Sequence, residues 1–183
     1  MKPIITAIFC CFALTNTFAD SGHFYAATQV GYGRLEIRDD YLIPELTDST
    51  TTIGLYLTGG YQTLFNLLFE VGGGFGENVG GSLIDNYELA ELRAGIGFAI
   101  PLGSRFTLVP KAGINRWRLA VEEDQFLNPG PEDNFTSRDT EGYIQLDAEI
   151  QIVSFIALDF SIFKMDAKFG DFDSIRFGVQ FEF

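Results

Sequence analysis

The chain has 183 residues, of which 46% are hydrophobic and 15% aromatic, and its net charge is −13. This length indicates one domain, and the negative charge argues against nucleic-acid binding because it repels the phosphate backbone. Only 20% of the residues are charged, so the chain is too apolar for disorder and rather apolar for a water-soluble protein of this size.

Residues 1–19 are typical of a secretory signal peptide. Lys2 precedes an apolar stretch from Ile4 to Leu14, and Thr17 to Ala19 end it with the small residues that signal peptidase prefers. We therefore expect export and a mature domain over residues 20–183. Both cysteines, Cys10 and Cys11, lie in the removed segment, so we expect no disulfide, thiolate metal site or cysteine nucleophile in the mature chain.

Apolar residues then alternate with polar or small residues along eight segments, and a period of two predicts β-strands. The clearest alternation is at the C-terminus, where apolar side chains occupy every second position from Ile175 to Phe183. In chain order, the other expected strands are 24–33, 53–62, 67–76, 91–100, 106–119, 144–152 and 156–162.

The connections between these segments alternate in length. Short turns are expected at 63–66, 101–105 and 153–155, and the long connections at 39–51, 77–86, 122–139 and 165–171. Short turns at one end and long loops at the other are typical of an outer-membrane barrel. The pattern predicts an all-β fold, an eight-stranded antiparallel up-and-down transmembrane β-barrel.

The charged residues indicate which face points inward. A soluble ligand-binding barrel would place its large apolar residues inside, but a narrow barrel has no room for Ile, Leu and Phe on every strand. We therefore expect the apolar face to meet lipid and the other face to line the lumen. Its charged residues are Glu70, Glu91, Arg93, Lys111, Asp147, Glu149, Asp159, Arg176 and Glu182.

At this point the mature chain resembles the OmpA-like eight-stranded outer-membrane barrels of Gram-negative bacteria. The resemblance rests on residues 24–32, 59–62 and 108–113 and on the terminal phenylalanine. It implies recognition by the barrel-assembly machinery through the alternating C-terminal residues Phe177, Val179, Phe181 and Phe183. No peptidoglycan-binding domain follows Phe183, so the likeness is to stand-alone barrels, and cell-wall anchoring is not carried over.

Charges inside a membrane protein are costly unless they are paired, so the lumen residues predict a structural ion-pair network. A narrow small-solute pore and a catalytic site remain alternatives, and lipid-modifying enzymes do exist on this architecture. Acyl-transfer chemistry usually needs a histidine base, and His23 is the only histidine. No catalytic motif occurs. We expect a protein that is not an enzyme, with no cofactor and no metal.

The expected loops are acidic, with Asp39, Asp40, Glu45 and Asp48 in the first and Glu122 to Asp124, Glu132, Asp133 and Asp139 in the longest. Arg34, Arg116 and Arg118 lie near the outer strand ends, where they could reach lipid phosphates. We expect a monomer in the outer membrane that contacts outer-membrane lipid and lipopolysaccharide. Its role would be envelope integrity or attachment of an extracellular partner to the loops, and nucleic acid is not a partner.

Overall fold

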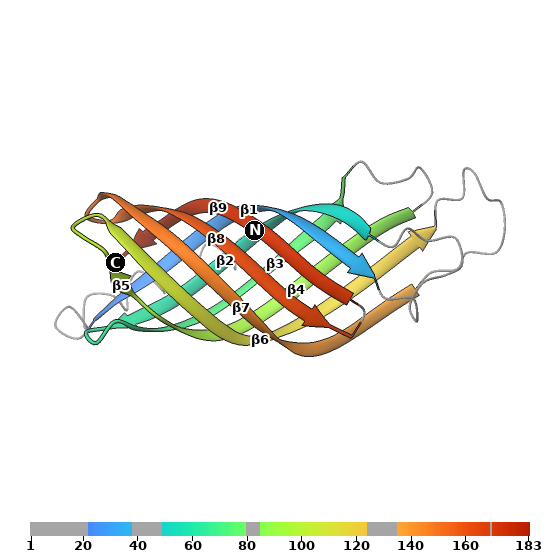
Figure 1. Ribbon diagram of the computed structural model, residues 1–183, viewed down its shortest axis with the longest axis horizontal. Coiled ribbons are helices and arrows are strands. Elements are labelled where there is room, and N and C mark those ends of the chain that lie inside the picture. Colours follow the sequence, from blue (N-terminus) through green and yellow to red (C-terminus); the bar gives the residue numbers. More distant parts are fainter. Residues whose placement is uncertain (1–21, 38–48, 80–84, 124–134, 169) are drawn as a thin grey trace, which may run out of the picture.

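The computed structural model describes residues 22–37, 49–79, 85–123, 135–168 and 170–183, and these residues form a barrel of antiparallel strands (Figure 1). The expected signal peptide lies outside the described residues. The strands are β1 (Gly22–Ile37), β2 (Ser49–Thr63), β3 (Leu67–Asn78), β4 (Asp85–Phe98), β5 (Ile100–Pro101), β6 (Phe106–Glu123), β7 (Phe135–Val153), β8 (Ile156–Ala167) and β9 (Gly170–Glu182).

The sheet closes on itself. β1 pairs with β9 and β4 pairs with β6, so every long strand has a neighbour on both sides. β5 continues the line of β4 after Ala99 and also pairs with β6. Counted with β4 as one strand, it completes a closed barrel of eight antiparallel strands, and the predicted fold class is confirmed. Closure leaves no strand edge unpaired, which a membrane-spanning sheet requires.

The three predicted short turns are confirmed. β2 ends at Thr63 before β3 starts at Leu67, where Asn66 adopts a left-handed backbone (φ 62°). The turn expected at 153–155 is tighter than predicted, since β7 runs to Val153 and β8 begins at Ile156. A bulge between Gln151 and Val153 supplies the extra residue, and this explains why the apolar positions keep the same parity on both strands.

The prediction of a long connection at 165–171 is wrong. β8 continues to Ala167 and β9 already starts at Gly170, so these strands form a tight hairpin in which Met165 lies opposite Phe172. β7 likewise starts at Phe135, inside the connection expected at 122–139. The alternation continues through these residues, but with the apolar side chains on the other face, and the polar outward residues there resemble a loop sequence.

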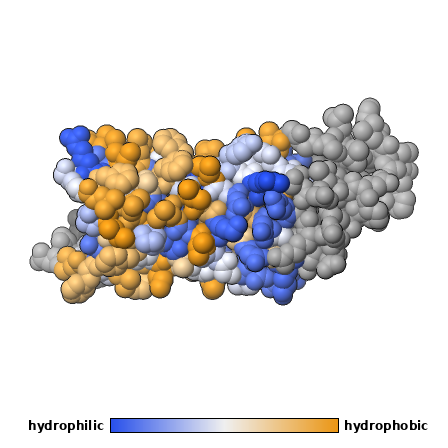
Figure 2. All heavy atoms as spheres, viewed as in Figure 1, coloured by the Kyte–Doolittle hydropathy of each residue, from blue (hydrophilic) through white to orange (hydrophobic). Residues whose placement is uncertain are grey.

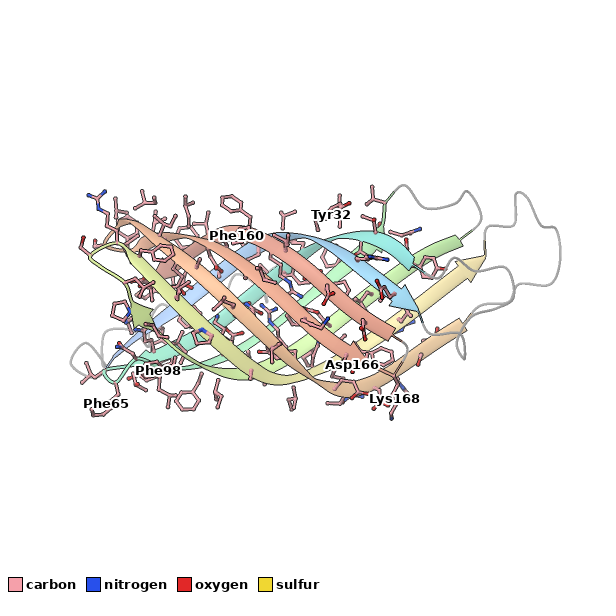
Figure 3. The ribbon with its side chains drawn as sticks, in the orientation of Figure 1. Tyr32, Phe65, Phe98, Phe160, Asp166 and Lys168 are labelled. Carbon is pink, nitrogen blue, oxygen red and sulfur yellow. The ribbon has the colours of Figure 1, made fainter. Side chains whose placement is uncertain are left out.

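An apolar belt surrounds the part of the barrel near the short turns (Figure 2). Its outward side chains are exposed on the isolated chain, as a surface facing lipid would be. Figure 3 shows Tyr32 and Phe160 in this belt, with Phe65 and Phe98 near the short turns. The large members of the belt include Val30, Tyr32, Leu55, Leu57, Phe69, Val71, Phe75, Leu92, Ile96, Ile114, Ile144, Leu146, Phe160, Ile162, Ile175 and Phe177.

Toward the long connections the polarity of the wall reverses. We call the outward residues there the polar collar: Arg34, Glu36, Glu77, Glu88, Arg116, Arg118, Arg138, Lys164, Asp166 and Asp173. Inside the collar lies an apolar cluster of Leu35, Tyr87, Leu89, Trp117, Leu119, Tyr143, Phe163, Met165, Ala167 and Phe172. Water around the collar explains the reversal, because the hydrophobic effect drives apolar side chains inward wherever the wall is solvated.

Candidate functional site

Eight of the nine predicted lumen charges are buried inside the barrel, and Glu182 is half-buried at the short-turn end. They come from β3, β4, β6, β7, β8 and β9, because alternate residues of every strand point inward. The centre of the belt therefore encloses a charged layer. Its interactions decide whether the layer is structural or leaves groups available for chemistry.

Lys111 on β6 joins two carboxylates on other strands. Its Nζ lies 2.5 Å from Glu70 Oε2 on β3 and 2.7 Å from Asp147 Oδ2 on β7. Tyr25 on β1 donates its hydroxyl to the same Glu70 oxygen at 3.1 Å. Buried charges are tolerated only when paired and hydrogen-bonded, and this cluster pairs one ammonium with two carboxylates while keeping one net negative charge.

Arg176 on β9 forms a second pair, with Glu91 on β4. Its two terminal nitrogens donate to the two carboxylate oxygens at 3.0 and 3.4 Å, the bidentate geometry that suits a guanidinium. The guanidinium also stacks between the rings of Tyr56, at 3.7 Å from its centroid, and Phe163, at 4.0 Å. Arg176 is thus completely buried, and both its charge and its flat faces have partners.

Glycine makes room for the ring that covers Arg176. A Cβ atom at Gly31 or Gly54 would come within 2.6 Å of the side chain of Tyr56, and one at Gly74 would clash with the same ring. These glycines lie on β1, β2 and β3, around Tyr56 on β2. They are needed for space, as expected of small residues that face a filled lumen.

Arg93 on β4 connects the two pairs. Its Nη1 lies 3.6 Å from Glu91 Oε1, its Nε lies 3.9 Å from Glu70 Oε1, and its Nη2 donates to Thr58 Oγ1 at 2.7 Å. Lys111, Glu70, Arg93, Glu91 and Arg176 therefore form one continuous chain of opposite charges. Such a network in a poorly hydrated interior stiffens the barrel and holds its charged groups in fixed contacts.

Two further acids face each other near the short-turn end. Glu149 on β7 lies directly opposite Asp159 on β8, and Asp159 accepts a hydrogen bond from Gln29 Nε2 at 2.6 Å. Among the described residues, no group of three or more His, Cys, Asp and Glu side chains is arranged to hold a metal ion. The described part of the chain also has no helix that is long and apolar enough to span a membrane.

Apolar side chains fill the lumen on both sides of the network. The cluster inside the collar closes the end with the long connections. Tyr25, Leu68, Ala99 and Val109 form a smaller cluster at the short-turn end. An eight-stranded barrel is narrow enough for side chains to fill it, and here apolar clusters lie toward both ends of the charged layer, which at the short-turn end also includes Glu149 and Asp159.

The remaining predicted residues lie on the barrel wall. Phe177, Phe181 and Phe183 are exposed on the outward face and Val179 is half-exposed. Phe183 exchanges two backbone hydrogen bonds with Phe24, at 2.8 and 3.3 Å, so the last residue helps close the seam between β9 and β1. His23 lies opposite Gln62 near the short-turn end.

The three predicted outer-rim arginines differ in their surroundings. Arg34 forms an ion pair with Glu36 at 3.0 Å. Arg116 and Arg118 point outward on β6, and Arg118 lies directly opposite Arg138 on β7. The sequence prediction missed Arg138 because that residue was assigned to a loop. Its alternation with Thr136 and Thr140 is the signal that could have placed it on a strand.

Most of the predicted acidic loop residues, namely Asp39, Asp40, Glu45, Asp48, Asp124, Glu132 and Asp133, lie outside the described residues. Glu122 and Glu123 belong to β6, and Asp139 belongs to β7. Asp139 lies beyond the belt, near the β8–β9 hairpin, and accepts hydrogen bonds from Lys168 and from the backbone of Thr140. These two donors lower the pKa of the Asp139 carboxyl.

Sequence comparisons find neither a matching family model nor a matching curated protein. Solved structures do match. Ail, the attachment invasion locus protein of Yersinia pestis, has a TM-score of 0.59 at 12% identity over 88% of this chain and 99% of Ail. Neisserial surface protein A has a TM-score of 0.64 at 13% identity, over 87% and 97% of the two chains. The outer membrane protein OprG of Pseudomonas aeruginosa has a TM-score of 0.54 at 12% identity, over 89% and 96%. The chain thus has the fold of small outer-membrane barrels.

Proposed function

We propose that this chain is an exported outer-membrane barrel of Gram-negative bacteria with a structural role in envelope integrity and a surface for attachment at its loop end. The observation that carries this proposal is the apolar belt around a filled lumen. The belt suits the hydrocarbon layer of a bilayer. Because the lumen is filled, the barrel can span that layer without opening a water path across it. Export through the signal peptide and insertion by the barrel-assembly machinery are part of the same proposal.

The direction of insertion follows from the two ends. Short turns of outer-membrane barrels face the periplasm and longer loops face outward, so the polar collar would stand in the extracellular headgroup region and the water above it. The collar lifts the loops away from the hydrocarbon layer. A partner would meet the loops first, which is why we place the attachment surface there and not on the wall.

We assign no enzymatic activity to the barrel. Catalysis would need polar groups held ready for a substrate, whereas the lumen cations are held by lumen carboxylates. Modification of lipid A is the enzymatic alternative. It predicts a change in the acylation of lipid A when the gene is deleted, and an unchanged pattern would support the structural role.

Deletion of the gene should make cells more sensitive to SDS and to large antibiotics that an intact outer membrane excludes. Restoring the wild-type chain should reverse this, and its unboiled band from outer-membrane fractions should migrate faster on an SDS gel than the boiled band. A chain with Phe183 removed serves as the assembly control. Recovery of the protein from the soluble periplasm, with no band shift, would contradict the proposal.

The purified barrel should give no discrete conductance steps in planar bilayers. Phe163 and Trp117 are buried in the apolar cluster inside the collar. Lys111 and Arg176 are buried in the charged layer next to it. Water-filled channels generally need many more strands than eight. A sixteen-stranded porin recorded in the same bilayers provides the positive control, and reproducible steps from the folded barrel would instead support a small-solute pore.

A further inference from the structure

Three arginines of the collar gather on one side of the barrel. Arg118 on β6 and Arg138 on β7 are directly opposite each other, and both point outward. Arg116 lies two residues along β6 on the same face, diagonal to Arg138. Like charges directly opposite each other destabilise an antiparallel pair. This arrangement, which we call the arginine triad, is notable in a chain whose net charge is −13.

The other cations of the described collar have acidic partners. Arg34 pairs with Glu36 at 3.0 Å, and Lys164 pairs with Asp173 at 3.2 Å. Lys168, at the same end of the barrel, pairs with Asp139. Among the described residues, no carboxylate forms an ion pair with a member of the triad.

The residues facing the triad do not neutralise it either. Arg116 lies opposite Leu92 on β4 and Thr140 on β7, and Arg118 lies opposite Ala90 on β4. Glu88, two residues from Ala90 on the same face of β4, is an outward carboxylate diagonal to Arg118, but no ion pair joins them. The three guanidinium groups therefore have no ion-pair partner among the described residues. Each offers a rigid fork of N–H donors that fits phosphate in a bidentate way.

The position of the triad along the barrel axis indicates which anion it meets. Ile114, the outward residue next below Arg116 on β6, is 60% exposed in the apolar belt, and Leu92 opposite Arg116 is 64% exposed. The triad thus begins where the belt ends. Long arginine side chains at such a boundary can rest their stems on the apolar surface and direct their charges to the headgroup layer.

We propose that the arginine triad binds the phosphate groups of lipid A, the anchor of lipopolysaccharide, at the outer surface of β6 and β7. This proposal rests on the outer-membrane placement proposed above, but not on a role in envelope integrity. Phosphate between Arg118 and Arg138 turns a repulsive cross-strand pair into two attractive contacts. The triad would therefore hold a lipid A molecule at one defined position on the barrel.

The test uses the folded mature barrel in phosphatidylcholine vesicles that contain bisphosphorylated lipid A or lipid A without its phosphates. The readout is the temperature at which the fast-migrating unboiled band is lost. The wild-type midpoint should be higher with the phosphorylated form, because a ligand that binds only the folded state stabilises it. The triple variant Arg116→Gln, Arg118→Gln, Arg138→Gln should lose this difference.

A matched control variant, Arg34→Gln with Lys164→Gln, removes two collar cations that have protein partners and should keep the difference. In titrations with fluorescent lipid A, the triple variant should bind about tenfold more weakly, the sum of three solvent-exposed charge contacts. In vesicles of phosphatidylcholine alone, the triple variant should be as stable as the wild type or more stable, because the repulsion is gone. A purely structural role would lower its stability in every lipid.

Several results would overturn the proposal. Equal stabilisation by lipid A with and without phosphate would show that the phosphate groups are not recognised. In another outcome, the triple variant keeps the phosphate-dependent difference in midpoint temperature and loses its binding to heparin. The triad would then be a site for a soluble sulfated polysaccharide. A wild-type barrel that inserts into neither vesicle would contradict the membrane placement itself, and the triad proposal with it.

Discussion

Replacing Arg176 by methionine should lower the free energy of unfolding of the barrel by about 3–5 kcal/mol, because buried Glu91 loses its bidentate partner and keeps Arg93, at 3.6 Å, as its remaining cation. The pair in question joins Arg176 to Glu91 inside the lumen, where neither side chain is reached by solvent. The guanidinium also fills the gap between Tyr56 and Phe163. Urea titration of the folded barrel in lipid vesicles, followed through the fluorescence of its single tryptophan, Trp117, measures the loss.

Two variants separate the buried pair from charge removal in general. Arg34→Met removes an exposed cation that pairs with Glu36, and it should cost less than about 1 kcal/mol. Adding Glu91→Gln to Arg176→Met should recover part of the loss, since the buried side chain at position 91 then carries no charge that has lost its bidentate partner. If Arg176→Met were as mild as Arg34→Met, the lumen network would contribute little to stability.

Replacing Phe163 by alanine should cost about 3–5 kcal/mol, the range for removing an aromatic ring from a packed core. Phe163 is completely buried. Its ring stacks on Tyr143 at 5.2 Å between centroids and meets Phe172 at 6.0 Å. The expected loss has two parts: the free energy gained by transferring the ring from water into the core, and the cost of the cavity left inside the collar. The same urea titration measures it.

Phe160 on the same strand provides the matched control. It points outward in the belt and is 43% exposed on the isolated chain (Figure 3). Phe160→Ala should cost about 2 kcal/mol or less, because lipid chains close over the site and only the transfer contribution is lost. Equal costs at the two positions would contradict the reversal of polarity between belt and collar.

Most of the barrel could be predicted from the sequence because alternation has a period of two in any strand, whatever lies around it. Glu70 and Asp147 were placed in the lumen on parity alone, and both are buried. The short turns followed from breaks in the same pattern. Alternation gives no information about distances across the lumen. It therefore could not show that Lys111 joins these two acids or that Arg93 links Glu70 to Glu91.

Alternation misleads where the outer face of the wall changes from apolar to polar. The prediction that apolar residues point outward ended the strands too early. At this end Phe163 and Met165 point inward, while Lys164 and Asp166 point outward. The β8–β9 hairpin was therefore taken for a loop. Figure 3 shows Asp166 and Lys168 at this end of the barrel. The solvent of each zone decides which face is polar, and a linear sequence does not state the solvent.

The number of strands, their order and the side chains that share a face could all be predicted from local alternation and from the breaks in it. The register between strands is a property of the folded barrel, and register decides which charges meet. It sets Lys164 on β8 opposite Asp173 on β9, but Arg118 on β6 opposite Arg138 on β7. Contacts between strands do not follow from alternation within one strand, so the difference between a paired cation and one that faces another cation appears only when the strands pair.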